Sequence, residues 1–368
     1  MESNIANLPI KIGKRTIKNR VTMAPTVKFF ASEDGMVTQD FVDHYEKRAK
    51  SGCGLIVLEA TCVSKEGRLH PTQLGLWEDA QIEGHKKIVQ AVHKHGALII
   101  PQIHYGGLGT HPDCGPMTSP SKVEWNNGVN ITEAKELNLE DIERIIRAFI
   151  DASVRAKKAG YDGVQLHACH SYLINDFASN VNKREDKYGK TLPDKARFGC
   201  EIIEGIRKEC GDDFIISARI SGADPSVAEA ISIAEYYVNS GCDYLQVSSG
   251  IGDFSDVPYD EALPYNKIAA LGVYMHEHFK GKIPVSCVNG LRNVEVVHYM
   301  LNNELVDTVD LACGLLADPA FAEAILDGSE YVKCFNCPDC AYGPEHTHIC
   351  PAMRIRKDNE FKMEELFK

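Results

Sequence analysis

The sequence contains no apolar run long enough to cross a membrane, and its N-terminus, MESNIANLPIKIGKR, lacks the apolar stretch of a secretory signal. It also has no excess of basic residues, because 40 Lys and Arg stand against 52 Asp and Glu, for a formal net charge of −12. Nucleic acids and anionic membranes attract basic surfaces, so neither is expected as a partner. We expect a cytoplasmic protein that acts on small molecules or proteins.

A glycine-rich G-x-G-x-x-G fingerprint is missing after the first apolar strand, which argues against a Rossmann fold. Instead, β-branched segments alternate with helical patterns such as 139–160, where apolar residues recur at three- and four-residue steps. Nearly continuous apolar strands separated by helices predict a parallel sheet, and eight such units favour a closed (β/α)8 TIM barrel. We expect this α/β barrel over residues 1–330 and a short cysteine-rich segment over 331–368. The expected strands are 21–25, 54–60, 97–104, 163–169, 214–221, 244–250, 283–290 and 306–313.

Polar residues gather at the ends of these expected strands. Catalytic side chains of such barrels lie where strands end and βα loops begin. Each residue taken alone could simply cap a strand end or be a hydrogen-bonded core histidine, but their joint placement predicts one site. The long connection 105–137, rich in Gly, Pro, Asn and Ser, would overhang that site as a lid. The residues at strand ends are Pro25, Thr26, Glu59, Gln102, His104, His167, His170, Tyr172, Arg219, Ser248, Ser249 and Asn289.

The 13 cysteines divide into nine scattered ones, mostly expected as buried thiols, and four near the C-terminus. Those four, Cys334, Cys337, Cys340 and Cys350, follow the pattern C-x2-C-x2-C-x9-C, and Pro351 comes next. Three close thiolates plus a remote one before proline favour a [4Fe–4S] cluster over structural zinc. The histidines at 346 and 348 are alternatives to Cys350 as the fourth ligand.

Several longer motifs support a more specific hypothesis. The chain contains KNRVTMAP, DHYEKRAKSGCGLIVLEATCVSKEGR, PQIHYGG, TSPSKV, AGYDGVQLHACHSYLINDFASNVNKREDKYG and VDLACGLLADP. In this combination the chain resembles the Old Yellow Enzyme family of FMN-dependent oxidoreductases, over about residues 8–355. Its cysteine pattern makes it most similar to the branch of 2,4-dienoyl-CoA reductase and trimethylamine dehydrogenase. The C-terminal nucleotide-binding domains of those proteins are not expected here.

The resemblance implies a set of FMN-binding residues. Arg219 would lie near flavin N1 and O2, where a fixed guanidinium stabilises negative charge; a structural ion pair is the alternative. The family's usual Gly-Arg for the phosphate is replaced by Ala312 and Cys313, so backbone N–H groups near Asn289 and at the next helix N-terminus would bind it. The sequence shows no side chain that would replace the missing arginine at the phosphate. The residues expected at the cofactor are Ala24, Pro25, Thr26, Ala60, Gln102, Arg219, Asn289, Gly290 and Cys313.

The resemblance also implies the chemistry of the H-x-x-H pair. His167 and His170 would hold the electron-withdrawing oxygen of a substrate, where two donors stabilise an enolate. Tyr172 would donate the proton, since a phenol stays protonated at neutral pH. Metal binding by the pair is the alternative for the histidines, but no further His, Asp or Glu lies at a sequence spacing typical of a metal site. The following run of Asn182, Arg184, Asp186 and Tyr188 would brace the loop.

Three hypotheses follow. The first is an ene-reductase for an α,β-unsaturated carbonyl, acid or thioester, with electrons supplied through the cluster. NAD(P)H would dock directly above the FMN, or a separate flavoprotein or ferredoxin would deliver electrons, and we favour the separate partner. The second is an amine dehydrogenase that passes electrons outwards. The third is a metal-binding scaffold without flavin, motivated by the missing phosphate arginine.

Overall fold

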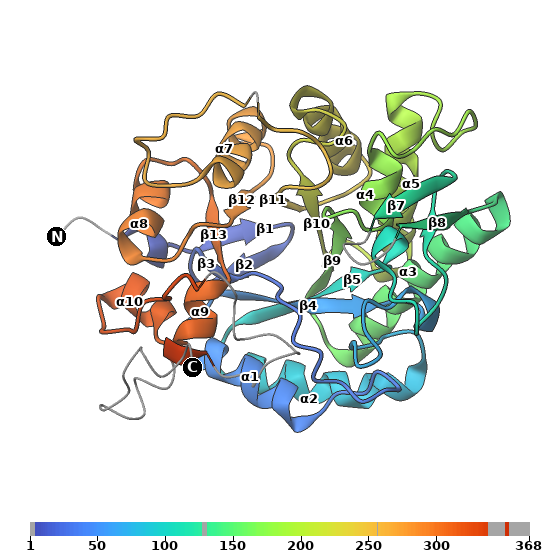
Figure 1. The fold of residues 1–368 in the computed structure, drawn as a ribbon. Helices are drawn as coiled ribbons and strands as arrows, with labels where there is room; N and C mark the ends of the chain where they lie inside the picture. Colours follow the sequence, from blue (N-terminus) through green and yellow to red (C-terminus); the bar gives the residue numbers. More distant parts are fainter. Residues whose placement is uncertain (1–3, 127–130, 256, 338–349, 353–368) are drawn as a thin grey trace, which may run out of the picture.

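The computed structural model describes residues 4–126, 131–255, 257–337 and 350–352. Its centre is a closed barrel of eight parallel strands, in the order β3, β4, β5, β9, β10, β11, β12 and β13, surrounded by helices (Figure 1). The predicted TIM barrel is therefore confirmed, with all eight expected strands. The barrel strands are β3 (Val21–Met23), β4 (Leu55–Cys62), β5 (Leu98–His104), β9 (Gly163–Ala168), β10 (Ile215–Ser221), β11 (Tyr244–Ser248), β12 (Val285–Val288) and β13 (Thr308–Leu311).

The helices follow the strands with clear sequence signals at their ends. Asn138 caps the longest helix by accepting the N–H of Asp141, and Gly160 ends it with a φ of 94°. The helices are α1 (Gln39–Lys50), α2 (Ile82–His93), α3 (Leu139–Ala159), α4 (Leu173–Ala178), α5 (Leu192–Cys210), α6 (Val227–Asn239), α7 (Lys267–Phe279), α8 (Val294–Asn302), α9 (Cys313–Ala317) and α10 (Phe321–Asp327). Short 3-10 turns are η1 (Ile5–Asn7), η2 (Lys65–Gly67), η3 (Asp79–Gln81) and η4 (Gly107–Gly109).

An N-terminal hairpin closes one end of the barrel. Its strands β1 (Ile10–Ile12) and β2 (Arg15–Ile17) pair antiparallel. Ile12 and Ile17 are fully buried in an apolar cluster with inward-facing residues from the first half of the barrel strands. Burying these side chains seals the N-terminal end, so the opposite end is the open mouth. The barrel members of this cluster are Leu55, Val57, Ile100, Ile215 and Tyr244.

The connection predicted as a lid is not an irregular loop. It contains β6 (Thr118–Ser119), β7 (Val123–Asn126) and β8 (Ile131–Glu136), which form a small three-stranded sheet beside the barrel (Figure 1). β8 pairs with β6 in parallel and with β7 antiparallel. Backbone pairing gives the segment a defined shape over one side of the mouth.

No helix among the described residues is both long and apolar enough to cross a membrane.

Candidate active site

One cavity of about 360 Å³ opens at the C-terminal ends of the barrel strands. It is lined by every residue expected from the sequence at the flavin or in catalysis except Ala24, which is fully buried and donates its N–H to the carbonyl of Leu311 at 2.9 Å. The expected residues that line the cavity are Pro25, Thr26, Ala60, Gln102, His167, His170, Tyr172, Arg219, Asn289, Gly290 and Cys313.

The register of neighbouring strands brings the polar side chains together. Gln102 on β5 pairs with Gln165 on β9, and Gln102 Nε2 donates to Gln165 Oε1 at 2.9 Å. Gln165 in turn donates to Ser217 on β10 at 3.1 Å. This chain of buried side chains fixes the amide of Gln102 at the floor of the cavity.

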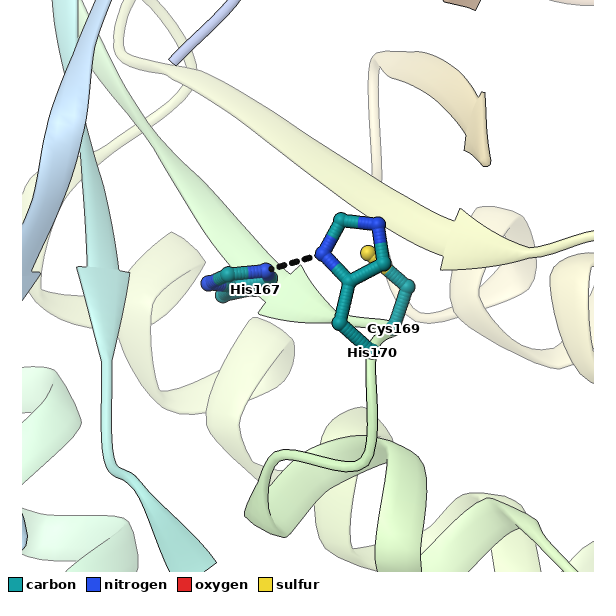
Figure 2. Close-up of side chains that lie close together, drawn as sticks. All are labelled: His167, Cys169 and His170. Atoms are coloured by element: carbon teal, nitrogen blue, oxygen red, sulfur yellow. Dashed lines mark hydrogen bonds between the residues drawn. The ribbon is translucent and has the colours of Figure 1, made fainter. Parts of the chain in front are cut away.

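Three histidines form a continuous chain of contacts. His104 Nδ1 lies 3.1 Å from His167 Nδ1, His167 Nε2 lies 3.1 Å from His170 Nδ1, and His170 Nε2 lies 2.8 Å from Ser248 Oγ. Figure 2 shows the contact between His167, at the end of β9, and His170 in the following turn. The Tyr172 ring packs against His104 and His167 at centroid distances of 4.4 and 4.5 Å. The sequence suggested no specific role for His104.

Burial keeps this group neutral. It lowers the pKa of His104 and of His170 to about 3, and the pKa of His167 also falls well below its usual value because of burial and the neighbouring rings. Burial raises the pKa of Tyr172 to about 12. At neutral pH the site therefore presents neutral imidazoles and a protonated phenol.

A metal-ligand geometry exists here as well. His167, Cys169 and His170 offer ligand atoms that lie within 4.8 Å of one another (Figure 2). However, Cys169 is fully buried and does not line the cavity. Both ring nitrogens of His167 and of His170 also contact neighbouring side chains. The arrangement favours hydrogen bonding over metal binding.

Arg219 is 8% exposed at the end of β10. Its Nη2 lies 3.4 Å from Ser248 Oγ, and its Nε has no hydrogen-bond partner among the described residues. None of the ion pairs among those residues includes Arg219, which argues against the structural ion pair considered above. A buried guanidinium with an unused donor suits an anionic or carbonyl-bearing group in the cavity, such as the flavin pyrimidine ring.

The loop after β12 forms the opposite end of the cavity. Asn289 and Gly290 have φ of 84° and 74°, which turns the backbone sharply. Two residues later, Arg292 also lines the cavity. Loops after the seventh and eighth strands are the usual phosphate site of TIM barrels, and β12 and β13 are those strands. Sequence reasoning missed Arg292, because no motif marks an arginine at this position.

The cysteine-rich segment begins beside this end of the cavity. A hydrogen bond with Cys313, with a further effect of Arg292, lowers the pKa of the Cys334 thiol to about 6. Cys334, Cys337 and Cys350 are partly exposed. Cys340, together with the histidines at 346 and 348, lies outside the described residues. A thiol that ionises readily has the chemistry of a metal ligand.

The polar run after the histidines braces the loop as expected. Asn182 Nδ2 donates to the carbonyl oxygens of Phe177 and Tyr188 at 2.8 and 2.7 Å. Arg184 donates to the carbonyls of Pro120 and Leu137 at 2.9 and 2.6 Å. The Arg184 bonds tie the ends of β6 and β8 to the segment that follows α4, and the Asn182 bonds hold that segment against α4.

A second cavity of about 620 Å³ lies between this sheet and the histidine loop. It shares His170 and Tyr172 with the first cavity, and its other walls include His111, Trp125 and Asn126 from the lid connection. The predicted lid thus contributes directly to the space next to the catalytic candidates.

Comparison with known proteins agrees with this geometry. Residues 8–330 match the model of the NADH:flavin oxidoreductase / NADH oxidase family. The chain is 35% identical to an NADH oxidase of Thermoanaerobacter brockii over 341 residues, which cover 89% of this chain and 52% of that protein. It is 32% identical to an NADPH dehydrogenase of Halalkalibacterium halodurans over 311 residues, covering 83% and 88% of the two chains. The chain thus spans about half of the NADH oxidase and most of the NADPH dehydrogenase.

Solved structures show the same fold. A 2-naphthoyl-CoA reductase in complex with 2-naphthoyl-CoA superimposes with a TM-score of 0.84 at 26% identity, covering 93% of this chain and 55% of the reductase. An Old Yellow Enzyme homologue from Zymomonas mobilis gives a TM-score of 0.76 at 26% identity, covering 89% and 94%. With the barrel, the mouth cavity and the family match in agreement, the chain belongs to the NADH:flavin oxidoreductase / NADH oxidase family of FMN-dependent oxidoreductases.

Proposed function

We propose that the protein reduces an activated C=C bond, conjugated to a ketone, acid or thioester carbonyl. The observation that carries this proposal is the meeting of His167, His170 and Tyr172 with Gln102 and Arg219 around one cavity. Hydrogen-bond donors for a carbonyl oxygen, a proton donor and a flavin-binding floor are the parts that this reaction requires.

The residues of the cavity suit FMN. Gln102 and the unused Nε donor of Arg219 would bind the flavin ring, with the backbone of 24–26 and Ala60 alongside it. Asn289, Gly290 and Arg292 would bind the phosphate, and Cys313 lines the same end. Here a guanidinium after β12 takes the place of the arginine that the family usually has after β13.

Bound FMN would supply the hydride that adds to the β-carbon of the substrate. His167 and His170 donate hydrogen bonds to the carbonyl oxygen, where negative charge develops as the π electrons of the C=C bond shift. The Tyr172 hydroxyl then gives its proton to the α-carbon, and solvent reprotonates the phenolate. Two electrons and two hydrogens are thus added to the double bond.

Electron supply is the second part of the proposal. Cys334, Cys337, Cys340 and Cys350 would hold a [4Fe–4S] cluster that exchanges electrons with a separate flavoprotein or ferredoxin. The contact of Cys334 with Cys313, a residue of the cavity wall, supports a short path between the two groups. Direct reduction by NAD(P)H, as the names of the relatives suggest, is the alternative donor.

The experiment is an anaerobic purification followed by absorption spectroscopy and determination of flavin, iron and acid-labile sulfide per chain. We expect one FMN with about four irons and four sulfides. The reduced protein is then mixed with α,β-unsaturated ketones and thioesters, and reoxidation of its flavin is followed. Photochemical reduction makes this assay independent of the natural electron donor.

Three results would contradict the proposal. Zinc without flavin would indicate a metal-binding scaffold. Flavin without iron would show that the protein holds no iron–sulfur cluster, and NAD(P)H would then be the electron donor. Reduction of the flavin by amines, with no reoxidation by unsaturated carbonyls, would identify an amine dehydrogenase.

A further inference from the structure

The turn between β9 and α4 has an unfavourable backbone conformation. His170 and Ser171, which we call the histidine turn, are consecutive residues in the left-handed region, with φ of 64° and 60°. The Cβ atom makes this region costly for residues other than glycine. The backbone hydrogen bond across the turn, from the N–H of Tyr172 to the carbonyl of Cys169, is long at 3.4 Å. The conformation therefore needs support from outside the turn.

Asn175 provides a hydrogen bond to this turn. It is buried in α4, and its Oδ1 accepts the N–H of Ser171 at 2.9 Å. The helix begins directly after Tyr172, whose side chain makes no capping hydrogen bond. A side chain at the third position of a helix commonly reaches back to a backbone N–H at the helix start, and Asn175 holds that position. Here it reaches back into the histidine turn.

Asp224 fixes the orientation of the Asn175 amide. Asp224 is buried in the loop after β10, and its Oδ2 accepts from Asn175 Nδ2 at 2.9 Å. The same oxygen accepts the N–H of Ile251 at 3.0 Å. Because a carboxylate accepts hydrogen bonds and donates none, the amide turns its NH2 group towards Asp224. Its oxygen then faces the N–H of Ser171.

The surroundings leave this pair little room to move. A Cβ added at Gly250 would collide with Asp224 Oδ2 and lie 2.8 Å from Asn175 Oδ1. The pair thus packs against the backbone that follows β11, next to Ser249, which lines the cavity. Hydrogen bonds in such a buried place are stronger than those in water.

We propose that Asn175, oriented by Asp224, is a positioning residue that holds the histidine turn in its left-handed conformation and thereby aims Tyr172 at the substrate. Neither Asn175 nor Asp224 lines the cavity, whereas His170 and Tyr172 do. A change of φ at Ser171 would swing the residue that follows it, and a displacement of about 1 Å can cost roughly 100-fold in rate. The inference rests on the proposed function for the reaction that it serves, but the hold on the turn is a property of the protein itself.

The first measurement is amide hydrogen exchange in the purified, oxidised protein labelled with 15N-serine. The Ser171 signal is identified by its loss in Ser171→Gly. In Asn175→Ala this N–H loses its acceptor, and its exchange should accelerate at least about tenfold. Asp224→Ala should accelerate it less, because Asn175 keeps its oxygen. Asp224→Asn can place an amide oxygen where Oδ2 lies, so its exchange should stay close to that of the wild type.

The second measurement tests whether the backbone conformation is the reason for this bond. Glycine adopts positive φ readily, so Ser171→Gly removes much of the need for support. In the wild-type background, Asn175→Ala should slow reoxidation of photoreduced flavin by an unsaturated ketone about 10- to 100-fold. In the Ser171→Gly background, the same substitution should cost less than about fivefold. Flavin content should not change, since Asn175 does not line the cavity.

Asn19→Ala is the matched control. Asn19 is also buried, and its side chain also accepts a backbone N–H, that of Val21, and donates to an oxygen, that of Gly52. It precedes β3 at the closed end of the barrel and does not line the cavity. The variant loses an equivalent pair of hydrogen bonds, yet Ser171 exchange and the reoxidation rate should match those of the wild type.

The outcomes are distinct. Unchanged exchange of the Ser171 N–H in Asn175→Ala overturns the proposal, and unchanged exchange in Asp224→Ala overturns the role assigned to Asp224. Equal slowing by Asn175→Ala with and without Ser171→Gly also overturns the proposal, because Asn175 then acts through packing. Faster exchange in Asn175→Ala, in a protein whose flavin no unsaturated carbonyl reoxidises, would refute the proposed reaction and leave the hold on the turn in place.

Discussion

Arg292, in the wall of the cavity, donates a hydrogen bond through Nη1 to the side-chain oxygen of Asn336, between Cys334 and Cys337 of the cysteine-rich segment. Since a guanidinium has five N–H donors, this bond leaves others for a phosphate. The same residue therefore connects the expected phosphate end of the flavin site to the expected cluster segment.

Replacing Arg292 by Ala should weaken FMN binding. Hydrogen bonds to charged groups contribute roughly 1.5–3 kcal/mol, so we expect the Kd for FMN to rise about 10- to 100-fold. Riboflavin lacks the phosphate, and its Kd should be the same in variant and wild type. Quenching of flavin fluorescence by the apoprotein measures both values. An equal loss of affinity for FMN and riboflavin would contradict the assignment, whereas Arg292→Lys should retain part of the FMN preference.

Acid should destabilise the protein through its buried histidines. The pKa of His104 and His170 is about 3 in the folded state, against an ordinary value of 6.5, so the unfolded chain takes up protons first as pH falls. Their contribution to stability is present above pH 6.5 and is lost as pH falls from 6.5 towards 3. Urea unfolding at several pH values should show a slope of up to ~1.4 kcal/mol per pH unit for each such histidine.

The matching variant is His104→Phe, which removes one titrating group. Its free energy of unfolding should depend less steeply on pH between 6.5 and 4.5 than that of the wild type. Identical slopes would show that His104 is protonated equally in both states. The same neutrality means that kcat should show no titration of His104 or His170 between pH 5 and 8.

Tyr172→Phe should separate the two half-reactions. Burial keeps the hydroxyl protonated, with a pKa of about 12, and loss of a general acid costs roughly 10²- to 10⁴-fold in rate. Stopped-flow reoxidation of the reduced flavin by an unsaturated ketone should slow by that factor, while reduction of the flavin is unchanged. Tyr105→Phe is the control, because that buried hydroxyl donates to Glu66 at 3.3 Å and does not line the cavity. Equal slowing in both variants would exclude Tyr172 as the proton donor.

The barrel was predictable because each of its strands is a short, mostly apolar segment followed by a helical pattern. A segment such as Leu55–Cys62 is apolar nearly throughout and buried at every position, which only a strand between two layers requires. Polar residues at such strand ends had to meet at the mouth, so the location of the site followed from the fold, whereas the roles of its residues were implied by the family resemblance. The small sheet was missed, because β6 has two residues and β8 exposes all but one of its six side chains.

The histidine chain and Arg292 needed the structure for a different reason. The sequence places His104 and Ser248 at strand ends, yet which ring nitrogen faces which neighbour depends on side-chain orientation across three strands. Arg292 lines the cavity just after Asn289 and Gly290, which turn the backbone with positive φ. Neither the histidine contacts nor the position of Arg292 follows from a residue spacing that can be recognised in the sequence.

Arg184→Met should loosen the lid sheet without unfolding the barrel. The Arg184 side chain is 9% exposed, and its loss leaves the carbonyls of Pro120 and Leu137 without this donor. Removing a charged donor from buried acceptors costs roughly 1.5–3 kcal/mol, here mainly in the local stability of β6–β8. Amide hydrogen exchange in 131–136 should accelerate at least about tenfold, while exchange in the barrel strands is unchanged.

The control for this variant is Arg147→Met, which removes an exposed arginine paired with Asp151 and Glu209 on the helix surface. Its side chain is 46% exposed, so solvent screens those pairs, and the effect on stability should stay within about 1 kcal/mol. Because Trp125 and Asn126 of the sheet line the second cavity, Arg184→Met should also raise KM more than it lowers kcat. Unchanged exchange and KM in Arg184→Met would mean that backbone pairing alone holds the lid, and that Arg184 does not position it over the site.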